Sequence, residues 1–114
     1  MAYDEALAER VRSLVTARGD AELVERKMFG GVAWMLRGNM ACGVMGDDLA
    51  VRLSHEDADD AVADPHVRRF AMKGRPPARG FVVVAGDAVA EDAELARWVD
   101  AGAAHALSLP PKSK

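Results

Sequence analysis

Three apolar runs in the middle of the chain alternate with small or polar residues and are separated by short, glycine-containing turns. An alternation of period two predicts strands with one buried face. Gly38-Asn39 and Gly46-Asp47-Asp48 separate the runs, and such residues tolerate the positive φ of tight hairpins. The sequence therefore predicts an antiparallel meander. Its expected strands cover residues 32–37, 40–44 and 49–53.

Helical patterns lie on both sides of this meander. Apolar residues at helical spacing predict an amphipathic helix over residues 4–18, which Gly19 ends. A short helix over residues 54–62 is expected to begin with Ser54 as its N-cap and to end before Pro65.

The remaining segments predict three further strands and a closing helix. Residues 23–29 alternate weakly, and residues 70–73 are a candidate short strand. The continuous apolar run at 81–85 predicts a strand that is covered on both faces. The last helix is expected over residues 91–107, where Gly102 costs roughly 1 kcal/mol relative to alanine. Its expected inward residues are Leu95, Trp98, Val99 and Ala106.

This order of elements predicts an α+β fold of two layers, in which helices pack against an antiparallel sheet formed by the meander and one or two further strands. The 114 residues form one domain by size. We expect that domain over residues 1–109 and a disordered tail over 110–114.

Charge is distributed unevenly along the chain. The net charge is −3, yet residues 67–86 contain five basic and no acidic residues. The rest carries ten basic and eighteen acidic residues, a charge of −8. An acidic protein with one basic segment is poorly suited to direct binding of nucleic acid. A local anion or an acidic protein partner suits that segment better.

Several residues bear on cofactors and location. His55, His66 and His105 lie in separate predicted elements without metal-ligand spacing, so we expect no metal and no cofactor. Cys42 is the only cysteine; it is expected to share a strand face with Met40 and to be a buried, inert thiol. A single cysteine, no signal peptide and no apolar segment of membrane-spanning length predict a cytoplasmic protein.

Two basic segments and a double glycine are the candidate functional residues. Gly30-Gly31 lacks the pattern of a phosphate loop and predicts a tight turn or bulge, with close approach of a ligand as the alternative. If the basic segments are neighbours in the sheet, they form a cationic surface over a glycine edge that binds an anion or an acidic partner. Alternatively, these side chains pair with the abundant carboxylates. The candidate residues are Arg26, Lys27, Gly30, Gly31, Lys73, Arg75 and Arg79.

The stretch Arg26-Lys27-Met28-Phe29-Gly30-Gly31 resembles the signature of the TfoX N-terminal domain, found in TfoX/Sxy competence regulators. The Gly46-Asp47-Asp48-Leu49 turn, the Lys73-Gly74-Arg75-Pro76 segment and Trp98 in the closing helix extend the resemblance over nearly the whole chain. The resemblance implies a fold like that of certain secretion chaperones. It also implies a stand-alone copy of a domain whose full-length relatives raise transcription of competence genes and carry a second domain.

We therefore expect a non-enzymatic regulatory domain that acts by binding a protein partner, since no catalytic constellation is visible. The alternative is a small anionic-ligand-binding protein or enzyme that uses the Gly30-Gly31 edge and the basic loop 73–79. An exposed apolar patch would favour partner binding, whereas a cationic cleft would favour the alternative. A homodimer formed through sheet edges is a further possibility.

Overall fold

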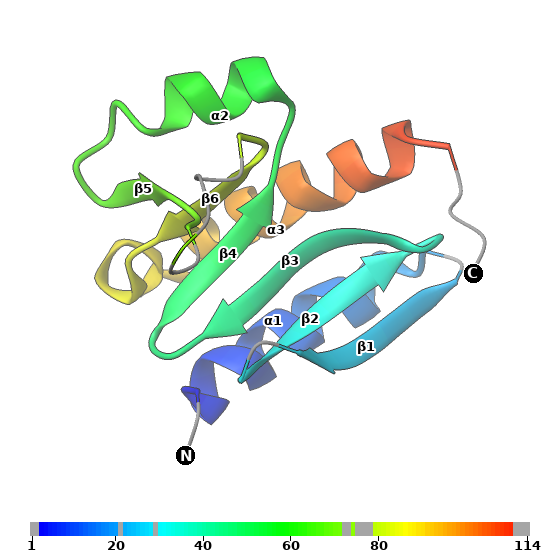
Figure 1. Cartoon of the computed structure of the whole chain (residues 1–114). Coiled ribbons are helices and arrows are strands. Elements are labelled where there is room, and N and C mark those ends of the chain that lie inside the picture. The colour runs from blue at the N-terminus through cyan, green and yellow to red at the C-terminus, as the bar shows by residue number, and fades with distance from the viewer. Residues whose placement is uncertain (1–2, 21, 29, 72–73, 75–78, 111–114) are drawn as a thin grey trace.

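The structure is a computed structural model that describes residues 3–20, 22–28, 30–71, 74 and 79–110. It confirms the α+β class, with an antiparallel sheet in the order β1-β2-β3-β4-β6-β5 (Figure 1). The elements are α1 (Glu5–Arg18), β1 (Leu23–Met28), β2 (Gly31–Leu36), β3 (Asn39–Met45), β4 (Asp48–Arg52), α2 (His55–Ala61), β5 (Val67–Arg69), β6 (Phe81–Val84), a 3-10 turn (Gly86–Val89) and α3 (Asp92–Ser108).

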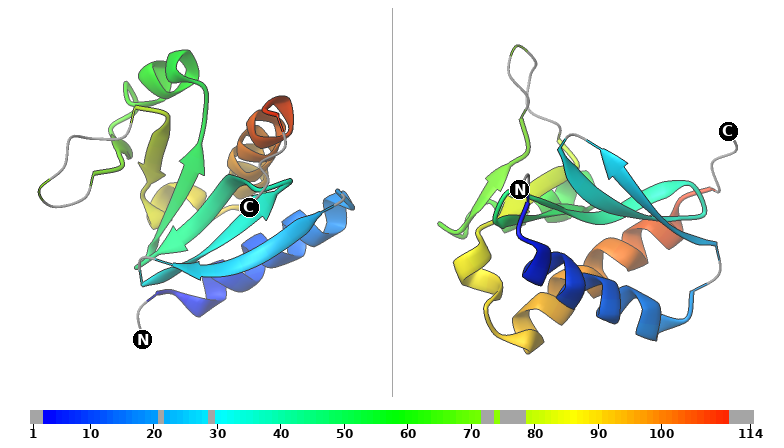
Figure 2. Two further views of the ribbon diagram at one scale, coloured as in Figure 1. Left: turned by 45° about the vertical axis from the view of Figure 1, so that its right-hand side comes forward. Right: turned by 90° about the horizontal axis from the view of Figure 1, so that it is seen from below.

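Two helices, α1 and α3, pack side by side on one face of the sheet (Figure 2). The core between these layers consists mainly of valine and leucine from both layers, together with Trp34 from β2. The predicted inward residues of α3 are all buried there. The short helix α2 follows β4 and contacts β6 near one end of the sheet.

The helix ends follow the sequence signals. The Asp4 side chain accepts hydrogen bonds from the backbone amides of Ala6 and Leu7 and caps α1, and Gly19 closes the helix at φ 71°. Ser54 Oγ accepts from the Asp57 amide at 3.0 Å, which confirms the predicted N-cap of α2. These caps satisfy backbone groups that have no partner within the helix.

The turn of the hairpin between β2 and β3 begins one residue earlier than predicted. Leu36 pairs with Asn39, so the two turn residues are Arg37 and Gly38, both at positive φ. Asn39 therefore lies in β3, where its buried side chain donates to the carbonyl oxygen of Pro110 at 3.0 Å. Residue type alone did not distinguish the two registers because glycine and asparagine both tolerate positive φ.

A bulge in β3 overturns the expectation that Met40 shares a face with Cys42. Trp34 pairs with Cys42 and Met35 with Met40, so Ala41 is an extra residue opposite β2. The bulge places Ala41 against α3, while Met40 faces the other side of the sheet with Met35. One extra residue is enough to reverse the face that the preceding residues present.

The fifth strand lies earlier than predicted. It spans Val67–Arg69, because these residues pair with Val82–Val84 of β6, and only the Phe70 amide continues the ladder, to Phe81. The described part of the expected strand at 70–73 is not in a strand, and residues 72–73 lie outside the described residues. β6 is buried on both faces, as its continuous apolar run predicts.

Two further points concern membranes and the C-terminus. No helix in the described ranges is long and apolar enough to cross a bilayer. Of the predicted tail at 110–114, only Pro110 is described.

Candidate functional site

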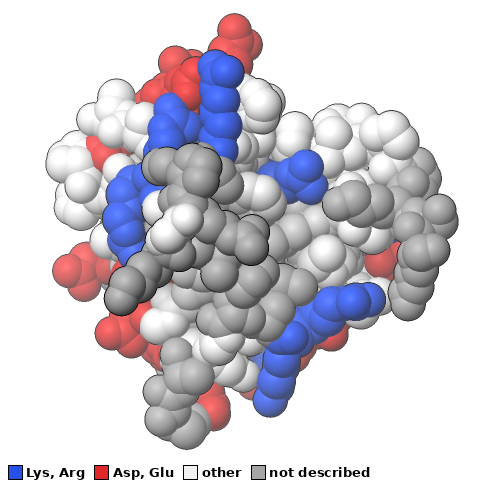
Figure 3. Space-filling view, in the orientation of Figure 1, with Lys and Arg blue, Asp and Glu red and all other residues white. Residues whose placement is uncertain are grey.

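The two basic segments are not neighbours in the sheet. Arg26 and Lys27 lie on β1 at one edge of the sheet, whereas Arg79 lies two residues before the start of β6. Three strands separate β1 from β6. Figure 3 shows the corresponding cationic groups apart on this face, one over β1 and one near α2 and β5. Lys73 and Arg75 lie outside the described residues.

The double glycine has a steric explanation. Gly30 turns the chain from β1 to β2 at φ 74° in open space, and a Cβ on Gly31 would lie 2.1 Å from the carbonyl oxygen of Val44. Gly30 thus supplies a left-handed turn, and Gly31 allows β2 and β3 to approach. This geometry agrees with the predicted tight turn and leaves no need for a ligand at these glycines.

Arg79 belongs to an ion-pair cluster between α2 and β5. Its guanidinium lies 3.0 Å from the Asp59 carboxylate, which also pairs with Arg69. The hydrogen bonds from Arg79, followed by those from Arg69, lower the pKa of Asp59 below its usual value. For Arg79, pairing with a carboxylate is therefore observed, as the structural alternative predicted.

Arg26 and Lys27 differ from Arg79. Both are exposed, and neither makes a salt bridge within the described part of the chain. Arg26 pairs across the ladder with Ala33, and Lys27 pairs with Val32. Among the described residues, β1 has a neighbouring strand only on its β2 side, so both cations border a strand edge that no other described strand covers.

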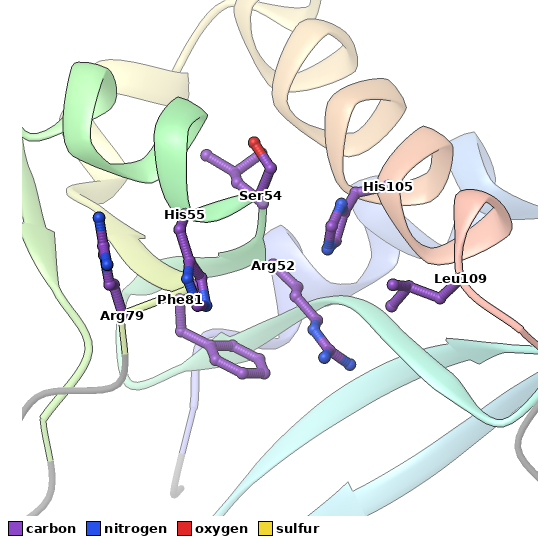
Figure 4. Close-up of a pocket in the computed structure, with 9 residues that line it drawn as sticks. Arg52, Ser54, His55, Arg79, Phe81, His105 and Leu109 are labelled. Atoms are coloured by element: carbon purple, nitrogen blue, oxygen red, sulfur yellow. The ribbon is translucent and has the colours of Figure 1, made fainter.

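A cavity of about 380 Å³ lies where β4 and β6 meet α2 and the end of α3. Figure 4 shows His55 and His105 on opposite sides of it, with the guanidinium of Arg52 extending between Phe81 and Leu109. Of the residues that the structure describes, those that line the cavity are Arg52, Leu53, Ser54, His55, Arg79, Gly80, Phe81, His105 and Leu109.

The cavity is assembled from four backbone segments. The Leu53 amide donates to the carbonyl oxygen of Gly80 at 2.7 Å and joins the end of β4 to the start of β6. A Cβ on Gly80 would lie 3.0 Å from the carbonyl oxygen of Leu53, so glycine allows these two backbone segments to approach closely beside the cavity. His105 enters from α3, on the far side of the cavity.

Arg52 and His105 both have electrostatic interactions with neighbouring groups in or beside the cavity. The Arg52 guanidinium carbon lies 5.4 Å from the centroid of Phe81, a cation–π contact, and Arg52 has no salt bridge in the described ranges. Burial lowers the pKa of His105 below its ordinary value; Arg52 and His55 add to this, and Asp57 opposes it. His105 is therefore neutral near pH 7 and ready to gain a proton if a negative charge approaches.

Cys42 is the buried thiol that the sequence predicts. It is fully buried, and burial raises its pKa to about 12. At neutral pH it is a protonated thiol, which is a poor nucleophile.

Sequence reasoning missed most of the cavity. His55 and His105 are far apart in sequence, and the sequence analysis placed them in separate elements without connecting them. Only Arg79 was a candidate among the lining residues. The available signal was that Arg52 and His55 flank Leu53-Ser54, where the chain passes from a strand to a helix. This pattern does not identify a third residue on α3.

The chain was compared with known proteins. The TfoX N-terminal domain family matches residues 17–106, from the end of α1 to near the end of α3. The chain belongs to this family. No curated protein and no solved structure gives a match. The match includes the basic pair, the double glycine and most of the cavity, and excludes Leu109.

Proposed function

We propose that this TfoX N-terminal domain is a cytoplasmic, non-enzymatic interaction domain that binds a protein partner through β1 and acts in the regulation of transcription. The single observation that carries the proposal is the edge of β1 that no other described strand covers, where Arg26 and Lys27 are exposed and make no salt bridge with any described residue. The regulatory setting is supported by family membership alone.

The exposed face of β1 combines apolar and cationic groups. Val24 is 46% exposed and is the one exposed large hydrophobic residue in the described part of the chain. Glu25 faces α1, where it pairs with Arg12. Because side chains alternate along a strand, Val24 and Arg26 share the opposite face of β1, away from α1. A partner strand beside β1 would thus meet Val24 and Arg26 on this face, and Lys27 together with Glu25 on the face toward α1.

The partner best suited to this edge is an extended acidic segment of another protein. An extended segment can add a strand to a sheet edge, and its backbone hydrogen bonds supply affinity while side chains supply specificity. β1 is six residues long, and alternate residues direct their backbone N–H and C=O groups toward the edge away from β2. Acidic side chains on that segment would complement Arg26 and Lys27, and they would also increase the rate of association.

The experiment compares the wild type with an Arg26→Glu/Lys27→Glu double variant in affinity capture from native cytosol, followed by titration of the captured partner in pure form. Arg68→Glu is the matched control, because Arg68 is exposed on the opposite edge strand and pairs with Asp48. We expect the double variant to lose the partner and the control to keep it. Hydrogen exchange of the complex should show new protection of β1.

Two outcomes would contradict the proposal. A partner that binds the double variant and the wild type equally would move the interaction away from β1. Concentration-dependent dimerisation with protection of β1, measured by sedimentation and hydrogen exchange, would assign the edge to a second copy of this chain instead.

A further inference from the structure

The cavity between β4, β6, α2 and α3 has a composition unlike the rest of the protein. The whole chain carries a net charge of −3, yet none of the described residues that line this cavity is an aspartate or a glutamate. Two arginines and two histidines do line it, together with the apolar side chains of Leu53, Phe81 and Leu109. A concave site with apolar walls and a few convergent polar groups is typical of small-molecule binding.

The four basic side chains are not equivalent. Arg79 is already paired with Asp59, at the mouth of the cavity toward α2. Arg52 is partly buried and rests on the Phe81 ring, without a carboxylate partner in the described ranges. Arg52 is therefore the cation whose charge is left for a ligand.

We propose that this cavity binds a small oxyanion, a carboxylate or a phosphate monoester, that carries an aromatic or aliphatic body. The planar guanidinium of Arg52 offers two parallel N–H donors to such a group. His55 and His105 flank it; each neutral ring has one N–H donor, and protonation adds a second donor and a positive charge. Phe81 and Leu109 contact the apolar body. The volume of about 380 Å³ limits the ligand to a small molecule.

This site is distinct from the glycine edge of the sequence-based hypothesis and from the proposed protein-binding edge. It lies at the end of β4, and two strands, β2 and β3, separate β4 from β1. Failure of partner binding at β1 would therefore leave this proposal intact, and the reverse also holds.

The test is an NMR titration of the whole chain with three probes: phenyl phosphate, benzoate and inorganic phosphate. We expect phenyl phosphate and benzoate to shift the imidazole signals of His55 and His105 in a saturable way, and inorganic phosphate to bind more weakly because it lacks an apolar body. The relative affinity of phenyl phosphate and benzoate distinguishes a phosphate ligand from a carboxylate ligand.

Variants locate the binding site. Arg52→Gln should weaken phenyl phosphate binding by about 10-fold or more, the usual effect of losing a charge-assisted hydrogen bond. Arg68→Gln makes the same change in net charge outside the cavity and should leave the affinity unchanged. Thermal unfolding and the amide spectrum establish that both variants are folded. His55→Gln is a second cavity variant if Arg52→Gln does not fold.

The pH dependence supplies an independent readout. Benzoate remains ionised between pH 6 and 8, so any change in its affinity there belongs to the protein. His105 faces Arg52 on β4 and His55 and Asp57 on α2, and a bound anion favours its protonated form. Benzoate should thus bind more tightly as the pH falls. The proposal is overturned if none of the probes shifts either histidine, or if Arg52→Gln binds phenyl phosphate as well as the wild type.

Discussion

The backbone of Gly102 on α3 lies against the carbonyl oxygen of Ala41 on β3, so closely that a Cβ on Gly102 would lie 2.2 Å from that oxygen. Ala41 is the bulged residue of β3, so the bulge and the glycine meet at one point. This contact holds α3 directly on the sheet. His105, three residues later on the same helix, then reaches the cavity beside Arg52.

Replacing Gly102 with alanine should destabilise the protein by about 1–3 kcal/mol, although alanine is the better helix former. The added methyl group must displace backbone rather than a flexible side chain. Ala101→Gly is the matched control, because Ala101 is exposed on the same helix and should cost only about 1 kcal/mol. Urea unfolding measures both values, and a stabilised Gly102→Ala variant would refute the close contact.

The sequence predicted the features that depend on neighbouring residues. The Ser54 cap follows from local hydrogen bonding, and φ preferences placed the turn between β2 and β3 to within one residue. Gly102 shows the limit of that reasoning: local propensity makes it a weak point in a helix, whereas the structure makes it a requirement of packing.

The cavity shows the same limit at longer range. Its two histidines are fifty positions apart, and they come together only because α3 crosses the sheet over the bulge in β3. The bulge itself leaves no clear signal, since Met40, Ala41 and Cys42 all suit a strand. The observed separation of Arg26 and Lys27 from Arg79 likewise depends on strand order, which the alternation of apolar residues does not determine.

The two glycines of the family signature should respond differently to substitution. Gly30→Ala places a side chain at positive φ and should cost about 1–2 kcal/mol, and Gly30→Asn should cost less because asparagine tolerates that conformation. At Gly31 both substitutions collide with the Val44 carbonyl, so asparagine should give no relief. Thermal unfolding of the four variants tests this, and equal tolerance at the two positions would contradict it.

Glu25 should make stability depend on pH. Its carboxylate accepts hydrogen bonds from Arg12 at 2.7 Å and from the indole of buried Trp34 at 3.0 Å. The bond from Arg12, with a smaller contribution from Trp34, lowers the pKa of Glu25. Because its folded-state pKa is lowered, Glu25 stabilises the fold at pH values above its unfolded-state pKa of about 4.3. This stabilisation is lost as the pH falls through the folded-state pKa.

The variants Glu25→Gln and Glu25→Ala separate the two contacts. Glutamine keeps an oxygen for Trp34 and loses only the half-exposed ion pair, so at pH 7 it should cost at most about 1 kcal/mol. Alanine also leaves the buried indole N–H without an acceptor, which adds about 1–3 kcal/mol. Urea unfolding at pH 7 and pH 3 is the measurement. The difference between the wild type and Glu25→Gln should shrink at pH 3, and a difference that grows would contradict the assignment.

The pKa of His105 should lie below its ordinary value, and Arg52 and Asp57 should shift this pKa in opposite directions. Burial is the main cause of its lowered pKa, and the charge of Arg52 is the next. Arg52→Gln should therefore raise the pKa of His105. Asp57→Asn should lower it further, because Asp57 favours the protonated ring. The backbone amide of Asp57, not its side chain, donates to Ser54 Oγ, so this substitution keeps the N-cap of α2.

An NMR pH titration of the imidazole signals measures these shifts directly, with Arg68→Gln as the control that leaves the His105 pKa unchanged. Because the folded-state pKa is lowered, His105 stabilises the fold above its unfolded pKa of about 6.5, and this is lost as the pH falls through the folded value. If Arg52→Gln and Asp57→Asn shift the pKa of His105 in the same direction, the described arrangement of charges around the cavity is contradicted. Opposite shifts would establish that Arg52 and Asp57 both act on His105 in solution, which is the electrostatic basis of the proposed anion site.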